Sequence, residues 1–65
     1  MRLIINGEPR EVSAQGLGEV LAELEFTGDW LATAVNSQLV PAAERAGFVL
    51  SDGDRVEILT PKQGG

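Results

Sequence analysis

The 65-residue sequence contains no cysteine, no histidine and no tyrosine. Without cysteine the chain cannot form a disulfide, and without cysteine or histidine it lacks the usual ligands of a structural zinc ion. A domain of this size buries only about 60% of the surface that its unfolded chain exposes, so short domains often need such crosslinks. We therefore expect a fold held by side-chain packing alone, which a hydrophobic fraction of 43% permits.

The same absences limit the enzymatic chemistry that the chain could perform. Histidine, cysteine and tyrosine supply many general acids, bases and nucleophiles, and no nucleophile motif replaces them here. The one close group of carboxylates is Asp52, Asp54 and Glu57, whose spacing matches no complete calcium loop. Asp52-Gly53-Asp54 is simpler to interpret as a turn. The sequence therefore predicts no catalytic side chain, no bound cofactor and no metal site.

Positive charge and long apolar runs are also scarce. Ten acidic and five basic residues give a net charge of −5 and a pI near 4.4, a balance that repels nucleic-acid phosphates. The apolar run Leu3-Ile4-Ile5 stops at Asn6, far short of a signal-peptide core or a membrane span. We expect a cytoplasmic protein that is monomeric alone and binds neither nucleic acid nor membrane.

Strand and turn residues are arranged in the first half as a hairpin followed by a helix. Residues 2–6 and 9–12 have strand patterns, and Asn6-Gly7 between them is a strong hairpin signal. Apolar residues then recur at the spacing of one helical face, which predicts a helix over 17–25. The members of this stripe are Leu17, Val20, Leu21 and Leu24. Glu19 and Glu23 are interpreted as a solvated outer face of this helix.

Three further strands are indicated in the second half, at residues 31–36, 38–40 and 55–60. Asn36-Ser37 can turn the chain between the first two, and residues 42–48 are irregular or briefly helical. The order of strand, strand, helix and three strands fits an α+β fold of the β-grasp type, although other small α+β rolls share it. In a β-grasp fold the first and last strands lie parallel in a mixed sheet, and one main helix packs across it. We place this domain at residues 1–60.

Alternation along the first and last strands suggests a partner-binding surface. If Leu3, Ile5, Val56 and Ile58 face the helix, then Ile4 and Leu59 project from the opposite face, where we expect them to be neighbours. Arg2, Arg55 and Glu57 share that face and would form a polar rim around them.

Residues 61–65, Pro61-Lys62-Gln63-Gly64-Gly65, contain no apolar side chain to bury and are expected to form a flexible tail. Five extended residues reach at most about 17 Å. Gly64 and Gly65 have no side chains that would obstruct a narrow channel. Such a tail could enter a partner's active site while the domain stays outside.

Several of these segments, taken in order, resemble the ThiS family of thiamine-biosynthesis sulfur carriers, which are ubiquitin-like β-grasp proteins. The resemblance covers essentially the whole chain. It is carried by Ile5-Asn6-Gly7, the helix, Ala34-Val35-Asn36, Val40-Pro41, residues 52–58 and the terminal Gln63-Gly64-Gly65.

The resemblance implies a sulfur-transfer cycle at the carboxyl end. An activating enzyme similar to the ubiquitin-activating enzymes would use ATP and magnesium to adenylate Gly65. Sulfur from a persulfide donor would then convert Gly65 to a thiocarboxylate, which supplies sulfur to thiazole synthase. In such a cycle Gly64 and Gln63 serve only as tail, and the domain identifies the carrier to its partners.

Three alternatives remain open from the sequence. The first is a sulfur carrier for molybdopterin synthase or for another sulfur metabolite, with the same activation chemistry. The second is a ubiquitin-like modifier, in which Gly65 would form an isopeptide bond with lysine. The third is a β-grasp regulatory module with an incidental tail.

Overall fold

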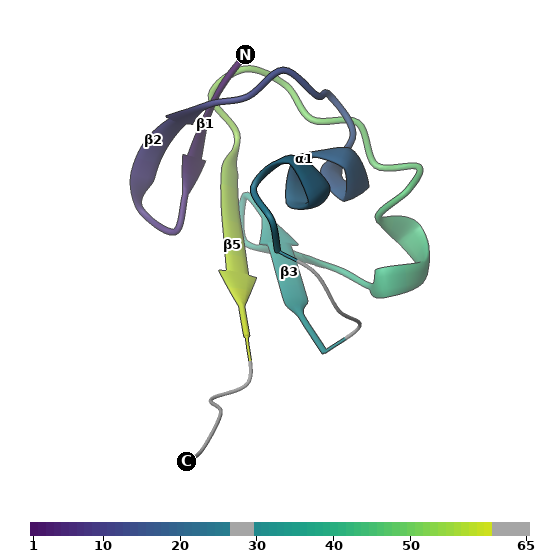
Figure 1. Ribbon diagram of the computed structural model, residues 1–65. Coiled ribbons are helices and arrows are strands. Elements are labelled where there is room, and N and C mark those ends of the chain that lie inside the picture. Colours follow the sequence, from purple (N-terminus) through teal and green to yellow (C-terminus); the bar gives the residue numbers. More distant parts are fainter. Residues whose placement is uncertain (27–29, 61–65) are drawn as a thin grey trace.

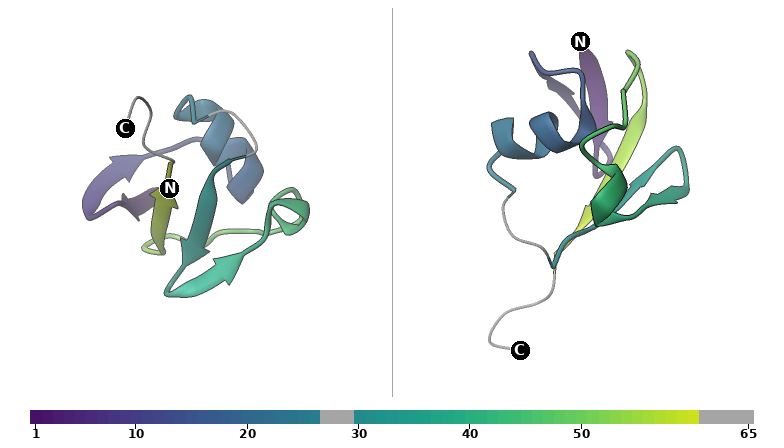
Figure 2. Two further views of the ribbon diagram at one scale, coloured as in Figure 1. Left: turned by 90° about the horizontal axis from the view of Figure 1, so that it is seen from below. Right: turned by 90° about the vertical axis from the view of Figure 1, so that its right-hand side faces the viewer.

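Five strands form one mixed sheet in the computed structural model, which describes residues 1–26 and 30–60. Their order across the sheet is β2-β1-β5-β3-β4, with one α-helix lying against one face (Figures 1 and 2). This arrangement confirms the predicted β-grasp fold. The elements are β1 (Arg2–Ile5), β2 (Glu8–Glu11), α1 (Leu17–Glu23), β3 (Ala32–Val35), β4 (Gln38–Val40), the 3₁₀ turn η1 (Ala42–Glu44) and β5 (Arg55–Leu59).

Two tight hairpins, β1–β2 and β3–β4, make up the outer parts of the sheet. Asn6 and Gly7 connect the first pair with φ angles of 51° and 86°, and Asn36 and Ser37 connect the second with φ angles of 50° and 73°. Positive φ at both turn positions is the type I′ geometry, whose twist matches that of the flanking strands. Both turns predicted from the sequence are confirmed.

The last strand, β5, lies in the middle of the sheet between these hairpins. It runs parallel to β1, with Ile4 opposite Arg55 and Ile5 opposite Val56, as expected from the β-grasp fold. β1 ends at Ile5, but the side chain of Asn6 continues the pairing. Its Nδ2 donates to the carbonyl of Ile58 (3.1 Å), and its Oδ1 accepts the N–H of Ile58 (2.8 Å).

The helix begins at Leu17, as predicted, but ends at Glu23 rather than at residue 25. Glu25 has a φ of 66°, a left-handed conformation that cannot continue an α-helix. Leu17, Val20 and Leu21 are buried against the sheet, whereas Leu24, beyond the helix, is only partly buried. The apolar stripe therefore predicts the buried face of the helix correctly but makes the helix too long.

Glu19 and Glu23 are exposed on the helix, as interpreted, but Glu23 also makes hydrogen bonds that the spacing did not predict. Its carboxylate accepts the backbone N–H of Ser13 (3.0 and 3.1 Å) and of Ala14 (3.0 Å). These hydrogen bonds favour the charged form and hold the pKa of Glu23 below its ordinary value. The carboxylate thus ties α1 to the chain that leaves the first hairpin.

Among the described residues, twelve buried apolar side chains fill the space between the sheet and the segments packed on it. They are Leu3, Ile5, Val12, Leu17, Val20, Leu21, Leu31, Val35, Val40, Leu50, Val56 and Ile58. Arg45, after η1, is buried beside them. Its Nε donates to Oγ1 of Thr33 (3.0 Å) and its Nη2 to the carbonyl of Leu31. A buried cation thereby fixes the start of β3.

The acidic segment before β5 forms the predicted turn. Oδ1 of Asp52 accepts the N–H of Arg2 (2.7 Å), and Oδ2 of Asp54 accepts the N–H of Ser51 (2.8 Å). Across residues 1–26 and 30–60, no group of three or more His, Cys, Asp or Glu side chains could hold a metal ion. Within the same ranges no helix is long and apolar enough to cross a membrane.

Candidate partner-binding face and carboxyl end

The sheet has one face toward α1 and one face away from it, and the predicted site residues lie on the second. In β1 and β5 the buried positions alternate with Arg2, Ile4, Arg55, Glu57 and Leu59. Among the described residues no α-helix lies against this second face (Figure 2). We call it the outer face.

Ile4 and Leu59 share the outer face but are not neighbours, so that part of the expectation is wrong. Ile4 is half-buried and pairs with Pro9 on one side and Arg55 on the other. Leu59 is four residues further along β5, about 13 Å at the usual rise per residue. The sequence pattern predicts which face a residue occupies, but the register that separates these two comes from long-range pairing.

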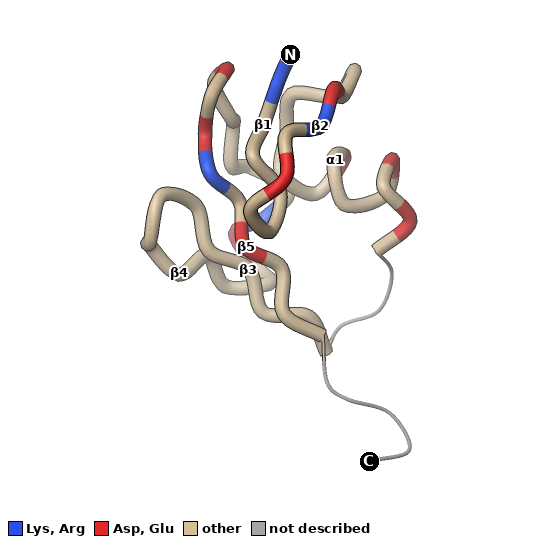
Figure 3. Tube along the Cα trace, turned by 90° about the vertical axis from the view of Figure 1, so that its left-hand side faces the viewer, with Lys and Arg blue, Asp and Glu red and all other residues tan. Residues whose placement is uncertain are grey.

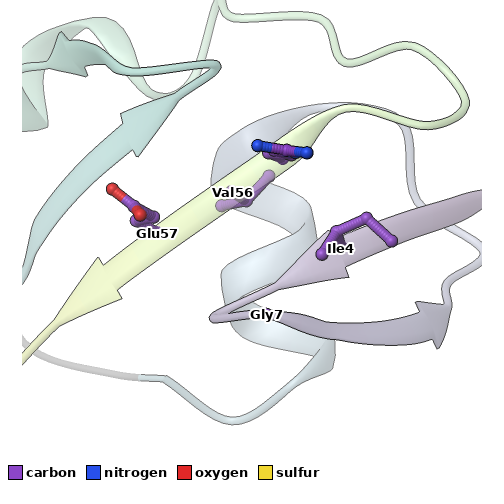
Figure 4. Close-up of a pocket in the computed structure, with 5 residues that line it drawn as sticks. Ile4, Gly7, Val56 and Glu57 are labelled. Carbon is purple, nitrogen blue, oxygen red and sulfur yellow. The ribbon is translucent and has the colours of Figure 1, made fainter.

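An open depression of about 350 Å³ lies on the outer face between β1 and β5. Ile4 and Gly7 line it from the first hairpin, and Arg55, Val56 and Glu57 from β5 (Figure 4). It combines an apolar wall with one charge of each sign. Such a depression can receive a single side chain from a partner.

Leu39 on β4 is an exposed outer-face residue that the sequence analysis did not identify. It is 72% exposed and lies opposite Ala34, and a second depression of about 60 Å³ joins it to Leu59. The sequence could have predicted this position, because a two-residue turn at Asn36-Ser37 places Leu39 opposite Ala34 and on the same face. Leu39 and Leu59, with the small side chains of β3 between them, form what we call the apolar end of the outer face.

Charged residues are distributed unevenly over the strands of the sheet (Figure 3). β1, β2 and β5 carry acidic and basic side chains, whereas β3 and β4 carry none. Arg2 lies opposite Glu11 on β2, with Nε and Oε1 3.8 Å apart, an exposed pair of little energetic weight. A partner would therefore meet charged side chains beside β1 and apolar ones beside β4.

The proposed reacting end of the chain follows β5 directly. Thr60 is the last described residue, and Gln63, Gly64 and Gly65 lie outside the described residues. Leu59 pairs with Ala32 at the start of β3, so the chain leaves the sheet beside the apolar end. The residues that end in Gly64-Gly65 thus follow the central strand of the sheet in the sequence.

The sheet order, the parallel pair at its centre and the single crossing helix define a ubiquitin-like β-grasp protein. The model of the ThiS family matches residues 3–65, and the chain belongs to this family. The match includes both terminal glycines.

Similar proteins carry names from thiamine biosynthesis. The sulfur carrier protein ThiS of Thermus thermophilus is 36% identical over 61 residues, 94% of this chain and 95% of that protein. A thiazole synthase of Paramagnetospirillum magneticum is 38% identical over 66 residues; the match covers 100% of this chain, which spans only 20% of that protein. The crystal structure of a thiamine biosynthesis protein (ThiS) from Geobacter metallireducens superposes with a TM-score of 0.84 at 26% identity, covering 100% of both chains.

Proposed function

We propose that the chain is a sulfur carrier of thiamine biosynthesis and that its reacting group is the carboxylate of Gly65. The observation that carries this proposal is the family match, which runs through Gly65 and covers nearly the whole domain. The similar protein of Thermus thermophilus is a sulfur carrier protein. On this proposal the chain is a co-substrate of its partner enzymes and does not catalyse a reaction itself.

The chemistry requires activation because a carboxylate is a poor electrophile. An adenylating enzyme with ATP and magnesium would join the Gly65 carboxylate to AMP and release pyrophosphate. The terminal sulfur of a persulfide donor then attacks the Gly65 carbonyl and displaces AMP. Cleavage of the donor's sulfur–sulfur bond by a thiol leaves the thiocarboxylate. These enzymes and ATP imply a cytoplasmic location.

Thiazole synthase is the proposed acceptor of the sulfur. A thiazole synthase of another organism contains a region similar to this entire chain. A carrier-like domain within the same polypeptide as the synthase supports a working association between the two. In this association the domain would dock outside the synthase, with Gly65 inside its active site.

Intact-protein mass spectrometry tests the reaction at Gly65. After incubation with the adenylating enzyme from the same genome, ATP, magnesium and a persulfide donor, the mass should rise by the difference between one sulfur and one oxygen. Fragmentation should place the change at Gly65. Gly65→Val should react poorly, because misplacement of about 1 Å at a reacting centre can cost about 100-fold in rate.

Two controls make this experiment decisive. Omission of ATP should prevent the mass change, and a peptide tag fused after Gly65 should block it while leaving the fold intact. An unchanged mass in the complete system would refute the carrier function. Conjugates at higher mass, with Gly65 joined to lysine, would identify a protein modifier instead.

We further propose that the outer face docks the adenylating enzyme through Ile4 and Leu59, with Arg2, Arg55 and Glu57 around them. Because the two aliphatic side chains lie apart, each needs its own variant. Leu59→Asp should weaken binding about tenfold or more without loss of stability, since this side chain is 68% exposed. Ile4→Asp should weaken both binding and folding because Ile4 is half-buried.

Calorimetric titration with the adenylating enzyme measures both affinities. Val49→Asp is the matched control, because Val49 is 72% exposed and lines a depression beside α1 rather than the outer face. Equal affinities for Leu59→Asp and Val49→Asp would rule out docking through the apolar end.

A further inference from the structure

Trp30 is the single tryptophan of the chain, and it is 76% exposed. The two phenylalanines, Phe26 and Phe48, are partly buried against the core. A large aromatic side chain contributes most to stability when it is buried, so an exposed one is available for binding. Exposed aromatic side chains at interfaces are a frequent source of binding energy.

The backbone that follows Trp30 is anchored to the core. Leu31, the next residue, is only 7% exposed, and its carbonyl accepts a hydrogen bond from the buried guanidinium of Arg45. Burial then alternates from Leu31 to Val35, with Ala32 and Ala34 turned away from the core, and Trp30 is exposed two residues before Ala32. The exposed ring is therefore attached directly to the anchored start of β3.

Trp30 also lies at the end of the sheet from which the chain departs. Ala32 pairs with Leu59, and Trp30 precedes Ala32 by two residues, beyond the last rung of that ladder. Thr60 follows Leu59 at the same end. Trp30 and Leu59 are thus both exposed apolar side chains at the end of the sheet where the chain leaves β5.

The length of the remaining chain limits how far a partner can stay from this point. Five residues follow Thr60, so Gly65 lies at most about 17 Å beyond it. Adenylation takes place in a pocket that excludes water, so part of this length must lie inside the enzyme. The surface around the enzyme's opening must therefore come close to Thr60, and Trp30 and Leu59 are placed to meet it.

We propose that Trp30, together with Leu59, packs against apolar side chains at the opening through which the adenylating enzyme receives the tail. The inference rests on the proposed function and adds a binding residue to it. Trp30 touches neither ATP nor the reacting carboxylate. It positions the end of β5 over the opening, and the tail then delivers Gly65.

Steady-state adenylation, followed as pyrophosphate release, tests this role by separating KM from kcat. Trp30→Ala should raise the KM for the carrier about tenfold or more and leave kcat within about twofold, because an interface tryptophan contributes binding rather than chemistry. Trp30→Phe should recover most of the loss. The matched control is Val49→Ala, equally exposed but beside α1, which should match the wild type.

Fluorine NMR supplies a readout that a merely structural role would not move. Because the chain has a single tryptophan, growth on 5-fluorotryptophan labels Trp30 alone, and the unlabelled enzyme adds no signal. The resonance of the free carrier should shift between H₂O and D₂O, as expected for an exposed ring. In the complex without ATP this solvent shift should be lost.

The outcomes separate this proposal from the one on which it rests. A wild-type chain that is adenylated normally, with a Trp30→Ala variant of unchanged KM, overturns the role of Trp30 alone. So does a solvent shift that persists in the complex. A wild-type chain that the enzyme does not adenylate overturns both proposals.

Discussion

The two hairpins of the sheet are built alike but hold β5 at different places. Each has a two-residue turn whose first residue is an asparagine with a φ near 50°. The amide of Asn6 bonds to Ile58 near the end of β5, whereas the amide of Asn36 bonds to Arg55 at its start (3.0 Å) and to Asp54 before it (3.0 Å). One asparagine secures where β5 begins, and the other secures where it is about to end.

The difference lies in burial. The hydrogen bonds of Asn6 are partly buried, and those of Asn36 are exposed. Water can replace the exposed bonds, but a partly buried N–H and carbonyl at Ile58 would be left without good partners. Asn6 therefore matters more for stability, and it acts one residue before Leu59, close to the proposed contact with the adenylating enzyme.

The largest expected effect comes from removing the Asn6 side chain. Asn6→Gly should lower the free energy of unfolding by about 1–3 kcal/mol, and Asn36→Gly by less than about 1 kcal/mol. Glycine accepts the positive φ at both positions, so the comparison isolates the side chains. Chemical denaturation measures both variants. An equal or greater cost at Asn36 would contradict the ranking by burial.

The second positions of the turns provide a reciprocal exchange of intermediate size. Gly7→Ser should lower the free energy of unfolding by about 1–2 kcal/mol, because an L-residue with positive φ is strained. Gly7 has open space around it, so no steric clash adds to this backbone strain. Ser37→Gly should stabilise the protein by about 0.5 kcal/mol, as relief of strain exceeds the entropy that glycine loses on folding. Thermal and chemical unfolding of both variants would show opposite signs. The same sign for both would refute backbone strain as the cause.

The smallest effect concerns acid and the segment that follows the first hairpin. The hydrogen bonds from Ser13 and Ala14 lower the pKa of Glu23 from its ordinary value of 4.5. The contribution of these hydrogen bonds to stability is complete above pH 4.5 and is lost as the pH falls through the lowered pKa of Glu23. Glu23→Gln should therefore lose less stability on acidification than the wild type does. Glu19→Gln is the control, and unfolding curves at neutral and acidic pH make the comparison.

Local sequence was sufficient for the parts of the fold that depend on neighbouring residues. Asn6-Gly7 and Asn36-Ser37 indicate their turns because few residues accept positive φ. The alternation in residues 31–36 predicts the buried positions of β3, since side chains on a strand point to opposite faces. The parallel pairing of β1 with β5 followed from the β-grasp interpretation of the element order rather than from any single segment.

Features that depend on long-range contacts were not predictable from local pattern. The distance between Ile4 and Leu59 follows from the register of β1 on β5, which periodicity leaves undetermined. Glu23 has the spacing of a solvated helix surface, and its bonds to Ser13 and Ala14 depend on how the preceding segment wraps. A tail is predicted from Gly64 and Gly65, which lie outside the described residues, and the chemistry proposed for it comes from the family resemblance.

The central place of β5 also determines how the chain can fold. β1 and β3 each pair with β5. The two hairpins can form early from local contacts, but they join into one sheet only when residues 55–59 insert between them. Pairing of β5 with β1 closes a long loop. This step is slow because the chain loses conformational entropy before the stabilising contacts form. A chain truncated before β5 would have no continuous sheet, because β1 and β3 are joined only through β5, so the sheet is completed by the strand that precedes the terminal glycines.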